Sequence, residues 1–236
     1  MSSSLPPEML DLIIDHLHDD PTTLKTCCTV SKSWIPRTRN HLFARVTFDT
    51  TEFRIEMWKK AFPDPSNSPA HHTRSLSIHA VPVIAATDIR TFHNVVHLQL
   101  WGMDRTSFPF YGFSPAIKSL SLIHVPPSSL DLICSFSFLE DLALVAFFPT
   151  EDEDGWNAPL TSPKLTETLD LAMLGKASAV IRRLLVLPSG LHFSKIAVLL
   201  SNEDAKSVTD LVSKCSGTLE SLTLRFYPES AFPSAL

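Results

Sequence analysis

The chain is poor in the residues and motifs on which most enzymes depend. Only six of its 236 residues are glycine, and it contains no GxGxxG, GxxxxGK[ST], HExxH or GxSxG motif, so phosphate-binding loops and the common catalytic sites have no sequence support. Its four cysteines form no CxxC pair and no disulfide-framework spacing, which fits a reducing compartment. We expect a protein that is not an enzyme, with no catalytic residue, cofactor or metal. A cysteine nucleophile remains the rival hypothesis, and it would need a histidine beside Cys27 or Cys28 in space.

Long apolar runs and a large excess of one charge are also absent. The longest apolar stretch, LALVAFF at residues 142–148, is a predicted buried strand and is far shorter than the roughly 18 residues of a membrane-spanning helix. The N-terminus lacks the basic-then-apolar order of a signal peptide. A net charge of −5 argues against nucleic acid or an anionic membrane as the main partner. We therefore expect a cytoplasmic or nuclear protein.

The N-terminus carries a predicted helix with more apolar surface than a small domain needs. On a helix of residues 5–17, LPPEMLDLIIDHL, the apolar side chains cover roughly 200°, whereas a helix that buries one face on its own domain needs little more than about 100°. Two helical stretches follow, TTLKTCCTV and SKSWIPRTRNHLF, and Pro36 predicts a turn through Trp34 with a helix restarting near Ile35. A unit this small seldom folds alone, which indicates that a partner completes its core.

This stretch resembles an F-box, in the version common in F-box proteins of mushroom-forming fungi. The resemblance covers residues 5–48 and rests on LPPEMLDLIIDHL, VSKSW and HLFARVTF in that order. Pro7, where the family often has an acidic residue, and Pro36 depart from the pattern without removing an anchor. The resemblance implies docking on a Skp-type adaptor, and through it on a cullin, in an SCF-type ubiquitin ligase complex. The implied adaptor-binding residues are Leu5, Pro6, Met9, Leu10, Ile13, Leu17, Leu24, Val30 and Trp34, of which the last three hold the bundle together or line the same interface. The alternative is a three-helix cap that packs on the rest of the chain.

The remainder of the chain repeats the phrase L-x-x-L-x-L. Its middle position falls, at intervals of 22, 22, 22, 27, 27 and 26 residues, on Leu76, Leu98, Leu120, Leu142, Leu169, Ile196 and Leu222. Each phrase is typical of a short strand, in which the middle residue and the one two positions later face the same side. Intervals of about 20–29 residues are the signature of leucine-rich repeats, which stack into a curved parallel sheet. The residues expected to be buried in register are Leu98, Leu100, Leu120, Leu122, Leu142 and Leu144. The alternative is an ordinary α/β sheet.

Together these patterns predict an α/β protein in three parts. They are an F-box (1–48), a linker helix and loop (49–72) and a degenerate leucine-rich repeat solenoid with a curved parallel sheet (73–236), which lacks the usual asparagine or cysteine after each strand. The linker segment TEFRIEMWKKAF has helical spacing, and we expect it to cover the edge of the first coil. The acidic stretch Glu151–Asp154 is interpreted as a solvated loop, because it lacks the alternate-residue ligand pattern of an EF-hand.

The predicted function is that of a substrate adaptor in protein–protein interaction, and the partner is a protein of unknown identity. The residues that flank each leucine pair are expected to form a concave, small-residue face on which only Lys195 and Arg225 are basic, so that it suits neither phosphate nor nucleic acid. The expected substrate-binding residues are His79, His97, Gln99, Trp101 and Ile123, with Trp101 as the one large anchor. The alternative function is a non-catalytic F-box/repeat scaffold or sequestering protein that acts without ubiquitin transfer.

Overall fold

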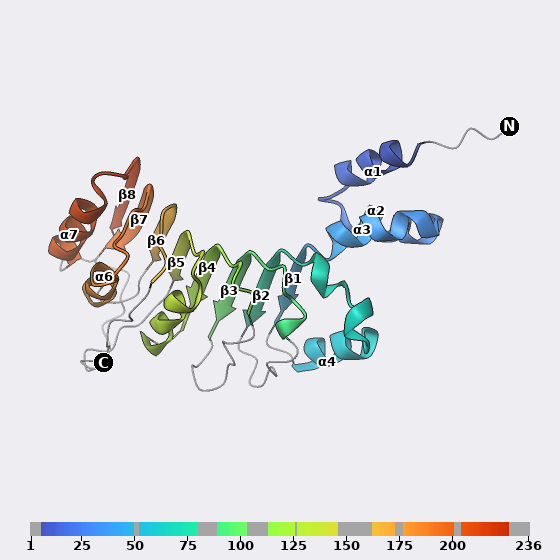
Figure 1. The fold of residues 1–236 in the computed structure, drawn as a ribbon, viewed down its shortest axis with the longest axis horizontal. Helices are drawn as coiled ribbons and strands as arrows, with labels where there is room; N and C mark the ends of the chain where they lie inside the picture. The colour runs from blue at the N-terminus through green and yellow to red at the C-terminus, as the bar shows by residue number, and fades with distance from the viewer. Residues whose placement is uncertain are drawn as a thin grey trace.

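The computed structural model describes residues 6–49, 52–79, 89–102, 113–125, 127–145, 162–172, 177–200 and 204–226. It is a mixed α/β protein with a single eight-stranded sheet, in which all neighbouring strands run parallel and follow one another in chain order. Helices α1–α3 stand at the β1 end of this sheet, and α6 and α7 lie at the β8 end (Figure 1). The strands are β1 (Arg45–Phe48), β2 (Ser75–His79), β3 (His97–Trp101), β4 (Ser119–Ile123), β5 (Asp141–Val145), β6 (Thr168–Ala172), β7 (Lys195–Leu200) and β8 (Ser221–Phe226).

The leucines of the repeated phrase lie side by side across the sheet. Leu98 pairs with Leu120, and Leu120 pairs with Leu142. Because side chains two positions apart on a strand share a face, both members of each pair enter the same core. None of the six leucines expected to be buried is more than 2% exposed: Leu98, Leu100, Leu120, Leu122, Leu142 and Leu144. The predictions of parallel strands and of buried leucine pairs are confirmed.

The sheet has one strand more than the seven that the repeated phrase predicts. β1 precedes the first phrase and pairs with β2. Its sequence, RVTF, lacks leucine, but Val46 and Phe48 are buried while Arg45 and Thr47 are exposed, which is the period-two pattern of a strand with one buried face. The expected linker helix is present as α4 (Glu52–Ala61). Ile55 of this helix belongs to the core that contains Leu76 and Ile78 of the first coil. The hydrogen-bonding edge of β2, however, is occupied by β1, which the repeated phrase did not predict.

The chain returns between strands through short helical segments that close the core. These are the 3₁₀ segment η6 (Pro127–Ser135) and helices α6 (Ala177–Leu185) and α7 (Ala205–Cys215). Val180, Ile181 and Leu184 of α6 and Leu211 of α7 are at most 1% exposed and belong to the same core as the strand leucines. At the far end of the sheet, β8 exposes every side chain.

A row of backbone hydrogen bonds joins the residues that precede successive strands, and we call it the carbonyl ladder. The carbonyl oxygen of Arg74 accepts from the amides of Val96 and His97, at 2.8 and 2.9 Å. The same bond to two consecutive amides of the next repeat recurs at the carbonyls of Ala44, Val96, Lys118, Glu167 and Ser194. At Glu140 the carbonyl accepts only from Glu167, and the next amide, Thr168, donates to the Asp141 carboxylate at 3.1 Å. Apart from the bond to Asp141, the ladder is made by backbone atoms and needs no particular side chain.

The N-terminal residues form a three-helix unit. It consists of α1 (Pro7–His16), α2 (Pro21–Val30), a 3₁₀ turn (Lys32–Trp34) and α3 (Ile35–Leu42), so the predicted turn through Trp34 and the restart at Ile35 are confirmed. Asp20 caps α2, where its carboxylate accepts from the amides of Thr22 and Thr23 at 3.1 and 3.0 Å. Between α4 and β2 lie two 3₁₀ turns, η2 (Pro65–Asn67) and η3 (Pro69–His72). In the part of the chain that the structure describes, no helix has the length and apolar character needed to cross a membrane.

Candidate protein-interaction surfaces

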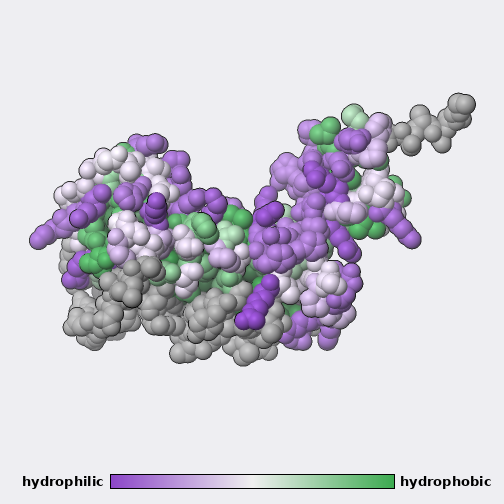
Figure 2. Space-filling view, in the orientation of Figure 1, coloured by the Kyte–Doolittle hydropathy of each residue, from purple (hydrophilic) through white to green (hydrophobic). Residues whose placement is uncertain are grey.

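The apolar side chains of α1 are mostly turned outward. Ile14 is 1% exposed, whereas Met9, Leu12 and Ile13 are 48%, 53% and 45% exposed. We call these three residues the α1 face. Val30, at the end of α2, is 61% exposed, and apolar residues are visible on the outer surface of the helical unit among a largely polar surround (Figure 2). Single exposed apolar residues are ordinary, but several on one short helix indicate a contact surface.

The predicted adaptor-binding residues divide by exposure into three groups. Pro6, Met9, Ile13 and Val30 are exposed, while Leu10, Leu17 and Trp34 are partly buried. Leu24 is 1% exposed and lies inside the bundle, so it supports the surface without touching a partner. Leu5 lies outside the described residues. Leu12 is the most exposed member of the α1 face, and sequence reasoning missed it as a contact residue although it lies in the apolar arc of the helix.

A charged cluster fixes α1 to α3 and so orients the α1 face. Arg37 donates two hydrogen bonds to the Asp15 carboxylate, one of them from Nε at 2.6 Å, and His41 Nε2 lies 2.8 Å from the same carboxylate. The hydrogen bonds from Arg37 lower the pKa of Asp15 from 3.8 to about 2, against the opposing effect of burial, and His41 adds to the lowering. α1 is thereby tied to α3 by its polar side while its apolar side stays free.

A second surface lies on the sheet around Trp101. The in-register pairing of β2 with β3 puts His79 beside Trp101, and their rings stack with centroids 4.8 Å apart. The Ser77 hydroxyl donates to Gln99 Oε1 at 3.0 Å and lies 3.1 Å from His79 Nε2. Three of the predicted substrate-binding residues, His79, Gln99 and Trp101, are therefore brought together.

The other two predicted substrate-binding residues, His97 and Ile123, differ in exposure. His97 is exposed at the start of β3. Ile123 is only 6% exposed, because its register places it between Trp101 on β3 and Val145 on β5, so it offers a partner little area. The Trp101 indole Nε1–H is buried and has no acceptor among the described residues, and a buried donor left without a partner costs free energy.

Metal-ligand groups and cysteines were the remaining candidates for reactive chemistry within the described ranges. No group of three His, Cys, Asp or Glu side chains there is arranged to hold a metal ion. None of the four cysteines, all of which lie in described segments, forms a disulfide, and Cys27 and Cys215 are buried. Burial raises the pKa of the Cys215 thiol, which lowers its reactivity.

No protein-family model matches this chain, and no curated protein resembles it closely enough to count as a match. Function is therefore inferred from the two surfaces and the sequence patterns that produce them.

Proposed function

We propose that this chain is a substrate-recognition adaptor of an SCF-type (cullin-RING) ubiquitin ligase. Residues 1–48 act as an F-box that docks on a Skp-type adaptor, and residues 73–236 act as a leucine-rich repeat solenoid that binds a protein substrate. The observation that carries the proposal is the α1 face. Met9, Leu12 and Ile13 are each about half exposed on a helix whose only buried residue is Ile14, and burial of apolar surface is the main driving force of association.

The sheet supports the second half of the proposal. Strands that recur at intervals of 22 to 27 residues and pair in register are the expected pattern of stacked repeats, whose open face serves as an extended binding surface. Trp101 supplies a large aromatic contact there, and aromatic residues in desolvated surroundings dominate most interfaces.

The mechanism that follows is proximity without chemistry from this chain. A substrate held on the sheet and a ubiquitin-charged enzyme held through the cullin become parts of one assembly. The acceptor lysine then meets the activated ubiquitin at a high effective concentration. The described residues need only bind and orient the two partners.

Adaptor binding is tested by calorimetry with a recombinant Skp-type adaptor. Truncation of interface anchors costs about 2 kcal/mol each, so Met9→Ala/Ile13→Ala should weaken binding at least about thirtyfold. Met57→Ala is the matched control, because Met57 is a 51% exposed methionine on α4, away from α1. The F-box assignment fails if the double variant binds like the wild type. Recovery of the Skp-type adaptor without a cullin would favour the scaffold alternative.

Substrate capture is tested separately with Trp101→Ala. This variant should bind the Skp-type adaptor normally and should lose the protein clients that accumulate with the wild type under proteasome inhibition. If client recovery is unchanged, the substrate surface lies away from the β2–β3 face.

A further inference from the structure

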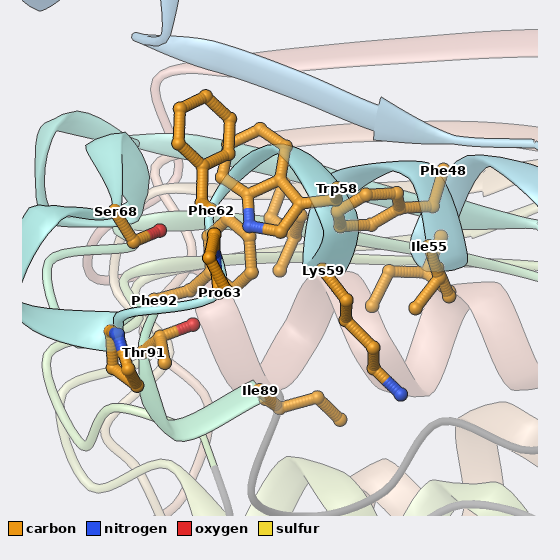
Figure 3. A pocket seen from close by; sticks show the side chains of 13 residues that line it. Phe48, Ile55, Trp58, Lys59, Phe62, Pro63, Ser68, Ile89, Thr91 and Phe92 are labelled. Atoms are coloured by element: carbon orange, nitrogen blue, oxygen red, sulfur yellow. The ribbon is translucent and has the colours of Figure 1, made fainter.

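An apolar cavity lies between α4 and the first strands of the sheet. Its volume is about 200 Å³. Phe48 of β1 and Leu76 and Ile78 of β2 line it from the sheet side, and Ile55 and Trp58 line it from α4. Figure 3 shows Trp58 across the cavity from Ile89. The lining residues all come from the stretch between Phe48 and Phe92.

The cavity is open on one side, and its floor is made of buried side chains. Phe48, Ile55, Leu76, Ile78 and Phe92 are all less than 8% exposed although they line it. Trp58 and Phe62, two of the aromatic residues that line the cavity, also pack against Phe43 at the end of α3. Phe43 contacts both rings edge to face, with ring centroids 5.8 and 5.9 Å apart. Protein interiors are normally packed without such voids, and an apolar cavity of about 150 Å³ is enough to bind benzene. The space is therefore large enough for one aromatic ring.

Polar groups are confined to the edges of the cavity. Ser68 is 3% exposed, and its oxygen accepts from the amide of Ala70 at 3.3 Å, which leaves the hydroxyl hydrogen to donate. Figure 3 shows the hydroxyl oxygens of Ser68 and Thr91 on the same side as Pro63, whereas Lys59 Nζ points away at the opposite end. Lys59 Nζ lies 3.3 Å from the Glu56 carboxylate, so the ammonium group at this end already has an anionic neighbour.

We propose that this cavity is a binding site for a small, neutral, one-ring aromatic molecule that carries a single hydrogen-bond acceptor. The ring fits against Trp58 and Phe92, and the acceptor takes the hydrogen of the Ser68 hydroxyl. A neutral ring is favoured over a charged one because the walls are apolar and Lys59 is already paired with Glu56, so a buried ion would lose hydration that they do not replace. The site is independent of ubiquitin ligation and stands whether or not the chain binds a Skp-type adaptor.

Phenol, toluene, benzoate and anilinium are the probes, titrated into the full chain. Binding is followed by the indole N–H resonances in NMR, assigned by Trp→Phe variants. Phenol and toluene should shift the Trp58 resonance saturably and leave Trp101 unchanged, and the two ions should shift neither. The absence of any saturable shift of Trp58 with phenol and toluene would overturn the proposal, as would equal shifts of Trp58 and Trp101.

The chain offers a matched control for the hydrogen bond, because the sequence Ser-Pro-Ala occurs twice. Ser68 and Ser114 each begin one copy, and each accepts from the amide two residues ahead, at 3.3 and 3.1 Å, but only Ser68 lines the cavity. Ser68→Ala should weaken phenol about tenfold, the worth of one hydrogen bond, and leave toluene unchanged. Ser114→Ala should change neither. Equal weakening of phenol by both variants, or by neither, would contradict the assigned role of Ser68.

A filled cavity provides the last control. Ile89→Phe places a ring in the space and should abolish binding of both phenol and toluene. Circular dichroism shows whether the variant is folded. If it is not, the comparison of phenol with toluene binding in Ser68→Ala tests the proposal instead. Undiminished toluene binding to a folded Ile89→Phe variant would show that the probe sits elsewhere and overturn the proposal.

Discussion

The helical unit and the sheet treat their apolar side chains in opposite ways. In β3–β5 both leucines of each phrase are at most 2% exposed, whereas α1 buries Ile14 alone and leaves Met9, Leu12 and Ile13 about half exposed. Both segments are apolar in sequence. The middle strands bury their leucines within the chain, because neighbouring strands and the connecting segments share one core with them. Met9, Leu12 and Ile13 of α1 have no such cover among the described residues, and the proposed function assigns this face to a partner.

This difference shows that an apolar sequence pattern can mark either a side chain buried within the chain or one left exposed for a partner. A pattern indicates which side chains gain from burial, but it does not say whether the burying surface belongs to the same chain. Substitutions can test this difference. Truncating a residue that is buried within the chain should lower the free energy of unfolding, whereas truncating a residue that a partner buries should lower the affinity for that partner.

The largest effect is expected for Leu120→Ala. Leu120 is fully buried in the middle of the sheet, and loss of its methyl groups should lower the free energy of unfolding by about 2–5 kcal/mol through lost burial and a residual cavity. Chemical denaturation followed by circular dichroism measures this change. A loss below 1 kcal/mol would mean that the sheet core repacks and that the contrast with α1 is weaker than the exposures indicate.

A smaller loss in the free energy of unfolding is expected for Leu222→Ala in β8. Leu222 occupies the same position of the phrase as Leu120 but is 42% exposed, so the same truncation should cost about 1 kcal/mol or less. The two variants are compared in the same denaturation series. Equal losses would show that position in the phrase, and not burial, sets the contribution of a leucine.

The attachment of α1 should weaken in acid. The pKa of Asp15 is lowered to about 2 in the folded chain, against 3.8 for the free group, so the carboxylate contributes stability that is present above about pH 4 and is lost as the pH falls toward 2. Amide hydrogen exchange of α1 should therefore accelerate over that range, and Asp15→Asn should already exchange fast at neutral pH. Identical pH profiles for the wild type and Asp15→Asn would remove Asp15 from this role.

The smallest stability effect is expected for Ile13→Ala. Because Ile13 is 45% exposed on the α1 face, the free energy of unfolding should change by no more than about 0.5 kcal/mol, even though binding to the proposed adaptor falls. Thermal denaturation of the isolated chain measures the first quantity. A loss comparable to that of Leu120→Ala would place Ile13 in the core of the chain and break the comparison.

The sheet was predictable from sequence because its strands carry two regular spacings, one within each leucine phrase and one between successive phrases. The period of two within each phrase fixes the buried face, and the 22-residue interval fixes the register, so the burial of Leu98 and Leu120 and the contact of His79 with Trp101 followed directly. β1 was missed because RVTF contains no leucine phrase and lies inside the stretch that resembles an F-box. Burial of Ile123 was missed because it depends on the size of its neighbours, Trp101 and Val145.

The cavity could not be predicted for a different reason. Phe48, Trp58 and Phe92 meet only when β1, α4 and the turn after Ile89 are folded together, and no spacing in the sequence encodes that meeting. Helical spacing in α4 indicated which residues share a face but not what that face would enclose. The functions proposed for α1 and for Trp101 stay predictions until partners are tested.

The carbonyl ladder also bears on how such a chain changes over evolutionary time. Each repeat is aligned to the next by one backbone oxygen and the strand that follows it, and both the 22-residue step from Arg74 to Val96 and the 27-residue step from Glu167 to Ser194 preserve this alignment. Lengthening a connecting segment by a few residues costs only a fraction of about 0.6 kcal/mol in closure entropy. Insertions between strands are therefore nearly neutral where they leave the buried side chains of the connecting helices, such as Val180 and Leu211, in place. New surface loops can be gained there without disturbing the sheet that presents them.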